Sequence, residues 1–431
     1  MRKTNIKLRN LVFYQIYVRN FSKEGNFKAI IKDLDRIKEL GVDVILLLPI
    51  HPIGEVDRIG TLGSPYSIKD YNAIREELGT KDDFEALIEA VHDKKMKLMM
   101  DIVYNHTAKD SYYHRNHPEW YFKDDEGQST SKVNKWTDVY DFNFSSDKAL
   151  WFELLNILVD YTRMGIDGFR VDTASMIPLD FWKMARRQVK KFNRNFIWLS
   201  ESIRGKHCKQ LRDMGLNCLS EAELYQEFDM AQDLDVEPDQ KAYLKGEGPL
   251  RTYIEGLRRQ EEIYPTNYVK LHHIETYDSE RIAARLDSDL DRILNWTGFL
   301  FFQKGATLLY AGQEFTSDRL PSLHEKDVFN KTTDISDFIK KLAKLKTRKV
   351  FASGRYGVHM RDDQGVAYQT FENDKNAYHG IFNLEKRKGR LKVYLKDGRY
   401  RNYLDKKIIK VENGMIDLQA KPIVIREKLN G

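Results

Sequence analysis

The sequence predicts an α/β fold, a (β/α)8 TIM barrel with a short insertion after the third strand and a C-terminal antiparallel β-sandwich domain. Over the first part of the chain, short apolar runs alternate with longer amphipathic stretches, which is typical of parallel strands joined by helices. We count eight such runs, the number that a closed barrel of this kind requires. After about residue 350 the helical patterns stop and only short β-like segments remain.

Each expected barrel strand is a short run rich in branched and aromatic apolar residues. The clearest helices lie at 27–41 and 82–96, where apolar residues recur every three to four positions. Gly41 is a suitable C-cap for the first of these helices. In such a barrel the active site lies at the C-terminal ends of the strands, so the residues that follow each run are candidates. The eight runs are Val12–Val18, Val44–Pro49, Lys97–Val103, Gly168–Val171, Phe196–Leu199, Phe228–Ala231, Tyr268–Ile274 and Thr307–Tyr310.

One connection is too long for a simple loop. A helix at about 148–163 accounts for part of the interval between the third and fourth strands, which leaves 107–147. This segment is rich in Tyr, Trp, His, Asp and Ser, and its aromatic content predicts an ordered insertion over the barrel mouth. We therefore expect a barrel formed by 1–106 and 148–349, the insertion at 107–147, and a β domain at 350–431.

The composition argues against several classes of protein. The 71 basic and 65 acidic residues are interspersed and give a net charge of only +6, which favours a solvated surface over a nucleic-acid interface. The sequence has no apolar run of about 18 residues and no cleavage motif after its basic start, so we expect neither a membrane span nor a leader. Its two cysteines, Cys208 and Cys218, suit a reducing compartment. A soluble cytoplasmic protein is the expectation; the sequence leaves its oligomeric state open.

A pair of charges lies in an apolar strand. Arg170 and Asp172 are two apart in GFRVDTA, so on a strand they face the same side. Buried charges are costly unless they are paired or functional. Glu201 and Asp278 also follow strand runs, as does His106, and strand order would direct all of these side chains into one cavity. Any one of them alone is more often structural, but the combination favours a site.

Paired carboxyl groups are suited to cleaving a glycosidic bond. In the retaining reaction one carboxylate is the nucleophile and forms a covalent glycosyl intermediate, while the other group acts as acid and base. The acid needs a raised pKa, from burial or from a neighbouring carboxylate, and the nucleophile must stay ionised. We expect Arg170 to hold Asp172 in its charged form.

Several segments also resemble the α-amylase family of glycoside hydrolases, glycoside hydrolase family 13, over about residues 10–350. DIVYNH at 101–106 resembles the first family signature, and GFRVDTA resembles the second. VFYQIYVRNF, YSIKDYNAIREELGTKDDF and YAGQEF resemble further segments in the family's order. The resemblance implies the same barrel with an insertion and a C-terminal β domain.

The resemblance also implies roles for individual residues. Asp172 matches the nucleophile and Glu201 the acid/base. Asp278 matches a third carboxylate, which binds ring hydroxyls and helps to distort the sugar. The remaining matches all contact the sugar or the nucleophile: Tyr66 stacks on the sugar at the cleavage point, His106 hydrogen-bonds it, and Arg170 lies beside the nucleophile.

This sequence departs from the family pattern at two places. The fourth signature usually reads N-H-D, and here it is Thr276–Tyr277–Asp278, so Tyr277 stands where a histidine contacts the sugar. Asn105 and Asp141 match positions that bind calcium in many members, but the usual histidine ligand has no counterpart, because Ala174, Ser175 and Met176 follow the nucleophile segment. Calcium prefers six to eight oxygen ligands. We expect no cofactor; calcium is possible but lacks a full ligand set.

The leading hypothesis is a hydrolase of α-1,4-linked maltodextrin oligosaccharides. Thr173 after the nucleophile and Ser67 after Tyr66 weakly favour, by resemblance, α-1,4 linkages and chains over strict removal of terminal glucose. A 4-α-glucanotransferase on the same scaffold and a non-catalytic carbohydrate-binding relative are the alternatives. An α-glucan oligosaccharide is the expected partner, with no nucleic acid and no membrane. The insertion's aromatic residues fit either a sugar platform or a small core: Tyr112, Tyr113, Trp120, Tyr121 and Trp136.

Overall fold

The centre of the molecule is a closed barrel of parallel strands. A computed structural model describes residues 4–133, 136–360 and 365–429. Neighbouring strands follow the order β1-β10-β9-β8-β7-β6-β3-β2 around the barrel. All eight predicted runs form these strands, so the predicted barrel is confirmed, with strand ends shifted by a few residues. The strands are β1 (Val12–Ile16), β2 (Val44–Leu47), β3 (Lys97–Val103), β6 (Gly168–Asp172), β7 (Ile197–Ser200), β8 (Met230–Gln232), β9 (Lys270–His272) and β10 (Gly305–Tyr310).

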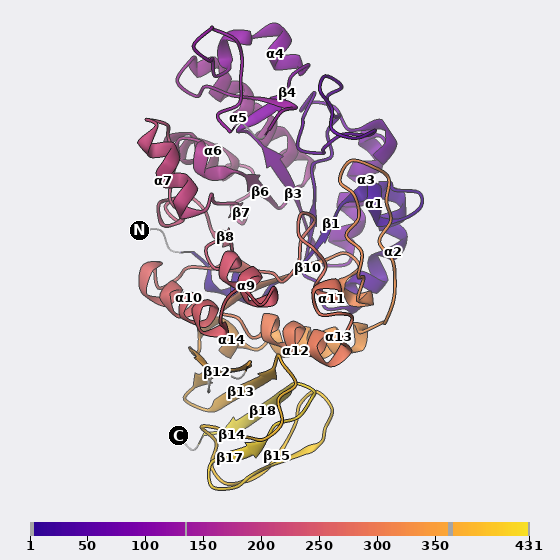
Figure 1. The fold of residues 1–431 in the computed structure, drawn as a ribbon. Coiled ribbons are helices and arrows are strands. Elements are labelled where there is room, and N and C mark those ends of the chain that lie inside the picture. Colours follow the sequence, from indigo (N-terminus) through magenta and orange to yellow (C-terminus); the bar gives the residue numbers. More distant parts are fainter. Residues whose placement is uncertain (1–3, 134–135, 361–364, 430–431) are drawn as a thin grey trace.

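Helices enclose the barrel (Figure 1). Local signals fix their ends: Thr80 and Asp83 form a capping box that starts α3, and Gly165 ends α5 in a left-handed conformation with φ 111°. The main helices are α2 (Phe27–Glu39), α3 (Lys81–Asp93), α5 (Lys148–Met164), α6 (Leu179–Val189), α7 (Gly205–Asp213), α9 (Glu237–Leu244), α10 (Leu250–Ile263), α12 (Leu290–Phe301) and α13 (Ser336–Lys346). Shorter ones are η1 (Ile6–Asn10), α1 (Val18–Phe21), η2 (Glu76–Leu78), η4 (Ala174–Met176), α8 (Glu221–Leu224), α11 (Ile282–Arg285), η5 (Gln313–Phe315) and α14 (Lys349–Ser353).

The inside of the barrel changes from apolar to charged along its axis. Met99, Ile197 and Leu199 belong to a buried apolar cluster that fills one end of the barrel. Because side chains alternate along a strand, the next residue on the same face of β3 is Asp101, and the one that follows Leu199 is Glu201. The same sequence alternation therefore builds an apolar floor and, above it, a ring of charged side chains at the C-terminal strand ends.

The connection after β3 carries the insertion. It contains β4 (His106–Ala108), α4 (Tyr112–Asn116), η3 (Pro118–Trp120) and β5 (Val139–Asp141). β4 and β5 pair antiparallel. The side chains of Tyr113, Trp120 and Tyr121 are buried together and form a small core for this part of the chain. In Figure 1 the insertion lies at one end of the molecule, near β3 and α5.

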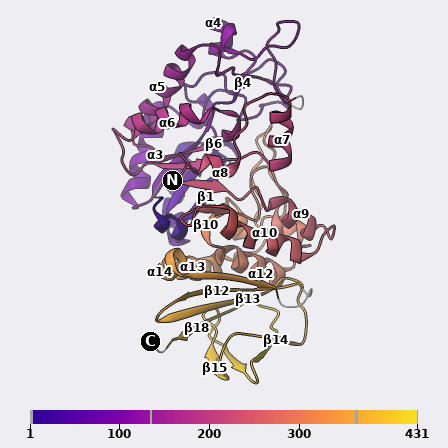
Figure 2. The same ribbon diagram turned by 90° about the vertical axis from the view of Figure 1, so that its left-hand side faces the viewer.

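The C-terminal segment forms antiparallel sheets at the opposite end of the molecule (Figure 2). The expected β domain is confirmed, although the sequence change near Val350 falls inside α14 and the first strand begins at Arg355. Phe382 packs on Phe299 of α12 with ring centroids 5.9 Å apart, which joins this domain to the barrel. Its strands are β11 (Arg355–Met360), β12 (Val366–Asn373), β13 (Asn376–Asn383), β14 (Arg390–Lys392), β15 (Gly398–Arg401), β16 (Ile408–Val411), β17 (Met415–Asp417) and β18 (Ile423–Lys428).

Two further observations bear on the sequence-based expectations. In the described part of the chain, no helix combines the length and the apolar character needed to cross a bilayer. Cys208 and Cys218 are both buried and both free thiols.

Candidate active site

One pocket collects the residues singled out from the sequence. It has a volume of about 410 Å³ and opens at the C-terminal ends of the barrel strands. Arg170 does not line it but contacts two of the lining carboxylates from the barrel interior, with its side chain 1% exposed. The other six predicted residues all line the pocket: Tyr66, His106, Asp172, Glu201, Tyr277 and Asp278.

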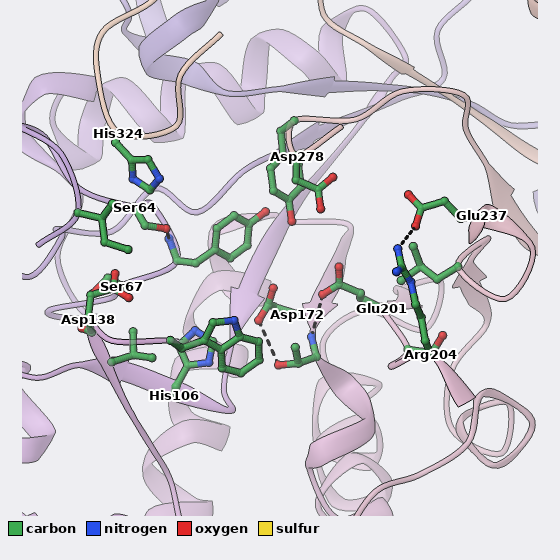
Figure 3. Close-up of a pocket in the computed structure, with 18 residues that line it drawn as sticks. Ser64, Ser67, His106, Asp138, Asp172, Glu201, Arg204, Glu237, Asp278 and His324 are labelled. Carbon is green, nitrogen blue, oxygen red and sulfur yellow. Dashed lines mark hydrogen bonds and ion pairs between the residues drawn. The ribbon is translucent and has the colours of Figure 1, made fainter. Parts of the chain in front are cut away.

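Three strands bring the three carboxylates together. Asp172 is the last residue of β6, Glu201 directly follows β7, and Asp278 lies in the loop after β9. β6 and β7 are parallel neighbours, so their C-terminal ends lie side by side. Figure 3 shows Asp172 and Glu201 next to each other, with Asp278 on another wall of the pocket.

Thr173 is bound to both members of the carboxylate pair. Its backbone N–H donates to Oε2 of Glu201 at 3.0 Å, and its hydroxyl donates to Oδ2 of Asp172 at 3.1 Å (Figure 3). The residue has a φ of 42°, a left-handed conformation that is uncommon outside glycine. This turn fixes both carboxyl groups through one residue.

The pair is electrostatically coupled. Burial raises the pKa of Glu201 to about 8; Arg170 opposes this shift, and the charge of Asp172 adds to it. Burial also raises the pKa of Asp172, while Arg170 and a hydrogen bond with Glu201 lower it. Arg170 therefore acts on Asp172 in the expected direction, but it does not outweigh burial.

Arg170 serves more groups than the sequence suggested. Nη1 lies 2.9 Å from Oδ2 of Asp101 and 3.4 Å from Oδ1 of Asp172. Nη2 lies 2.5 Å from Oε1 of Glu201 and donates to the hydroxyl of Tyr277 at 3.3 Å. One guanidinium thus holds three carboxylates and a phenol in place, which only a planar fork of donors can do.

Asp101 is a site residue that residue-by-residue reasoning missed. It is 0% exposed, and burial raises its pKa to about 6. Its Oδ2 accepts a hydrogen bond from the hydroxyl of Tyr66 at 2.6 Å. Asp101 is the first residue of DIVYNH at 101–106, and its inward position two residues after Met99 is the sequence signal that identifies it as a site residue.

Tyr66 and Tyr277 form the aromatic part of the pocket. Their rings stack with centroids 5.2 Å apart at an interplanar angle of 24°. Tyr277 therefore packs against Tyr66 as well as bonding Arg170. Beside it, the hydroxyl of Thr276 donates to Oδ1 of Asp278 at 2.5 Å, which orients that carboxylate.

His106 links the barrel to the insertion. Its ring lies 5.2 Å from that of Trp136, and its Nδ1 is 3.2 Å from the side-chain nitrogen of Asn105. Burial lowers the pKa of His106 and so favours the neutral imidazole. The insertion's aromatic residues divide accordingly: Trp136 lines the pocket, whereas Tyr113, Trp120 and Tyr121 form the core described above and Tyr112 is 48% exposed.

The rest of the wall comes from loops that carried no sequence signal. Arg204 pairs with Glu237 at 2.7 Å on one side of Glu201. His324, from the long segment after β10, lines the other side, together with Ile59 and Ser64. These residues lie on connections whose course depends on the whole fold, so the sequence pattern alone did not single them out.

Protein donors already engage Asp141, one of the two residues that match calcium ligands. Oδ2 of Asp141 accepts the backbone N–H of Lys132 at 3.0 Å, and Oδ1 accepts the hydroxyl of Ser131 at 3.3 Å. The ammonium of Lys132 donates to the Phe142 carbonyl at 2.9 Å and is attracted by Asp141. Although Oδ1 of Asn105 lacks a hydrogen bond, the described residues contain no cluster of three or more His, Cys, Asp or Glu that could hold a metal ion. Calcium prefers six to eight oxygen ligands, so Asn105 and Asp141 alone would not make a full set.

Comparisons with known proteins agree with this architecture. Residues 15–151 match the model of the α-amylase catalytic domain, and 358–425 match that of the bacterial α-amylase C-terminal domain. A crystal structure of an α-amylase from Lactobacillus plantarum superposes with a TM-score of 0.94 at 38% identity, covering 98% of this chain and 100% of that one. A maltogenic α-amylase from Thermotoga neapolitana gives 0.87 at 29% identity, covering 98% and 100%.

Curated relatives match over shorter stretches. The α-amylase MalA of Haloarcula japonica is 30% identical over 70% of this chain and 44% of its own length. An α-1,4-glucan:maltose-1-phosphate maltosyltransferase of Picrophilus torridus is 32% identical over 44% of this chain and 33% of its own length. This chain thus spans less than half the length of either relative.

Proposed function

The chain belongs to the α-amylase family of glycoside hydrolases, and we propose that it cleaves α-1,4-linked glucan oligosaccharides of the maltodextrin type through a covalent glycosyl intermediate on Asp172. The observation that carries this proposal is the turn at Thr173. It binds a buried carboxyl whose pKa is about 8 and a second carboxylate beside it, so one group is a proton donor at neutral pH and the other a nucleophile.

In the first step Asp172 attacks the anomeric carbon. The bond from that carbon to the glycosidic oxygen breaks as the carboxyl of Glu201 gives its proton to the departing oxygen. The products are a glycosyl ester of Asp172, a shortened sugar with a free hydroxyl, and an ionised Glu201. In the second step Glu201 takes a proton from water, the hydroxide attacks the anomeric carbon, and the ester bond to Asp172 breaks.

The surrounding residues would hold the sugar and the charges. Tyr66 offers a ring face to the sugar at the cleavage point, held by its hydrogen bond to Asp101. His106, neutral because it is buried, can donate to or accept from a sugar hydroxyl. Asp278, with one oxygen engaged by Thr276, keeps the other for ring hydroxyls. Arg170 compensates the charge on whichever carboxylate is ionised.

The same intermediate permits transfer to a second sugar. If a sugar hydroxyl replaces water in the second step, the product is a longer chain, and relatives of this chain carry both hydrolase and maltosyltransferase names. The arrangement of the carboxylates is common to both outcomes. We propose hydrolysis as the main reaction because the α-amylase structures match over 98% of this chain, whereas the maltosyltransferase matches over 44% of it.

Product analysis with maltoheptaose tests the proposal. The wild type should release shorter sugars, Asp172→Asn should release none, and Asp160→Asn, an exposed carboxylate on α5, should behave as the wild type. Sugars longer than maltoheptaose would identify transfer. Activity that survives in Asp172→Asn would refute the assignment of the nucleophile, and binding without turnover by the wild type would favour a non-catalytic relative.

A further inference from the structure

We propose that two loops close one end of the substrate cleft, so that the enzyme releases short sugars from the non-reducing ends of α-glucans rather than cutting within the chain. The two segments, 54–64 after β2 and 318–328 after β10, are called here the 54–64 loop and the 318–328 loop. This inference rests on the proposed function, because it concerns how the same cleft selects its substrate.

The two loops are joined directly to each other. The backbone N–H of Leu62 donates to the carbonyl of His324 at 2.9 Å, and that of Thr61 donates to the carboxylate of Glu325 at 2.7 Å. Gly60, with a φ of 68°, lies so close to His324 that an added Cβ would be only 2.6 Å from the Cβ of that residue. The contact is therefore continuous along three consecutive residues.

Buried residues that directly follow β1 hold both loops in place by hydrogen bonds. The side-chain nitrogen of Asn20 donates to the carbonyl of Ser322 at 2.6 Å, and its oxygen accepts the backbone N–H of Asp327 at 2.9 Å. The hydroxyl of Tyr17 donates to the carbonyl of Leu323 at 3.2 Å. Arg19 donates to the carbonyls of Leu62 and Gly63 at 3.3 and 3.4 Å. These anchors make the joined loops a fixed wall rather than a free flap.

The wall faces the site. Ile59 and Ser64 of the 54–64 loop and His324 of the 318–328 loop all line the pocket. Figure 3 shows His324 and Ser64 on one side of the carboxylate pair and Arg204 and Glu237 on the other. The pocket thus ends, on one side of Asp172, against side chains of two loops that are bonded together.

The opposite side of the pocket borders a second hollow. Ser202 and Arg204 line the main pocket and also this neighbouring hollow of about 320 Å³, whose other lining residues include Gly205 and Tyr264. Both residues follow Glu201 closely in the chain. The proton donor faces the departing sugar, so we expect this side to receive the leaving part of the substrate, and the walled side to receive the part that becomes attached to Asp172.

The asymmetry sets the direction of cleavage. In an α-glucan the sugar attached to Asp172 lies toward the non-reducing end, so a wall there limits the number of units that can extend past it. The leaving portion has no such limit. We therefore expect the enzyme to release short products such as glucose and maltose from the non-reducing end. It should also accept long substrates, because the leaving portion can extend beyond the pocket.

Two chromogenic substrates test the inference. One is 4-nitrophenyl maltoheptaoside, and the other is the same compound with a 4,6-ethylidene group on its non-reducing sugar. When the loss of each intact substrate is followed by chromatography without a coupling enzyme, the wild type should cleave the unblocked substrate at least about tenfold faster, because one bulky group against a fixed wall is worth that much discrimination. Equal rates would overturn the proposal, whereas no cleavage of either substrate would count against the proposed function instead.

Variants locate the effect. Ile59→Ala combined with His324→Ala should raise the ratio of blocked to unblocked cleavage and shift early products toward longer sugars. Ile408→Ala, a change on β16 of the C-terminal domain at a side chain that is 48% exposed, is the control and should leave the ratio unchanged. If the double variant remains folded by circular dichroism and keeps the wild-type ratio, these loops do not set the specificity.

Discussion

Nη1 of Arg170 lies 2.9 Å from Oδ2 of Asp101, closer than its 3.4 Å contact with Asp172. The nearest carboxylate to Nη1 of this arginine is therefore a residue that never reaches the pocket surface. Asp101 also accepts a hydrogen bond from the hydroxyl of Tyr66. One buried carboxylate therefore positions both the guanidinium of Arg170 and the Tyr66 ring that is proposed to stack on the sugar. We infer that Asp101 is a positioning residue.

Replacing this carboxylate should therefore disturb the site without touching the reacting atoms. We expect Asp101→Asn to lower kcat/KM by about 100-fold, since small displacements of catalytic groups cost that much. Breaking a buried ion pair should also lower the free energy of unfolding by about 3 kcal/mol. Steady-state kinetics and denaturant unfolding measure the two effects. Because a purely structural loss would not change the pH profile, a shifted alkaline limb in the variant distinguishes positioning from mere destabilisation.

The pH dependence follows from the carboxyl pair. Glu201 acts in its protonated form and its pKa is about 8, so kcat/KM should fall as the pH rises through about 8. Asp172 acts in its ionised form, and because burial raises its pKa, the acidic limb should lie above the ordinary range for an aspartate. A pH profile with a soluble maltodextrin checks both limbs.

Two variants control this assignment. Asp172 raises the pKa of Glu201 by charge repulsion, so in Asp172→Asn a titration of Glu201 followed by NMR should give a lower pKa than in the wild type. Burial of Glu201 favours its protonated form, so the stability it confers is present below its unfolded pKa and is lost as the pH rises through about 8. Glu201→Gln should thus gain stability relative to the wild type as the pH is raised from 5 to 9; a constant difference would contradict the raised pKa.

The barrel was predictable because its signals are local. The runs at Lys97–Val103 and Gly168–Val171 are short and mostly apolar, and polar residues follow them closely, which suffices to place a strand and its C-terminal end. The reach of Arg170 was not predictable, because its partners Asp101 and Tyr277 lie on other strands or loops, and only the closed barrel sets those distances. The contact between the 54–64 loop and the 318–328 loop was not predictable either, because the two loops are distant in sequence and no periodic pattern indicates that they meet.

Tyr277 is expected to contact the substrate in place of a histidine, and in the structure it also contacts Arg170 and Tyr66. Its hydroxyl accepts from Arg170 at 3.3 Å and its ring stacks on Tyr66. Tyr277→Phe should lower kcat/KM by no more than about tenfold, because it removes one weak hydrogen bond to a charged group. Tyr277→Ala should cost about 3 kcal/mol of stability through the cavity it leaves, and it should raise KM as Tyr66 loses support. If both variants behave alike, the ring stack contributes nothing to the site.

In the insertion, the ammonium group of Lys132 lies near the residues that match calcium ligands. Lys132 reaches the Phe142 carbonyl at 2.9 Å and interacts with Asp141 through its charge and its backbone N–H. We expect excess EDTA to leave both activity and the melting temperature unchanged, whereas Lys132→Met should destabilise the insertion by about 1–3 kcal/mol, because a carbonyl and a carboxylate lose their cation.

The matched control is Lys123→Met, an exposed lysine of the same insertion that bonds only the hydroxyl of Ser129 in the described structure. Amide hydrogen exchange of 107–133 should accelerate in the Lys132 variant and not in the control. Because His106 packs against Trp136 of this insertion, we also expect kcat/KM to fall in the Lys132 variant. A melting temperature that falls on chelation and recovers with calcium would instead show that Asn105 and Asp141 bind a metal ion, and that the lysine does not replace it.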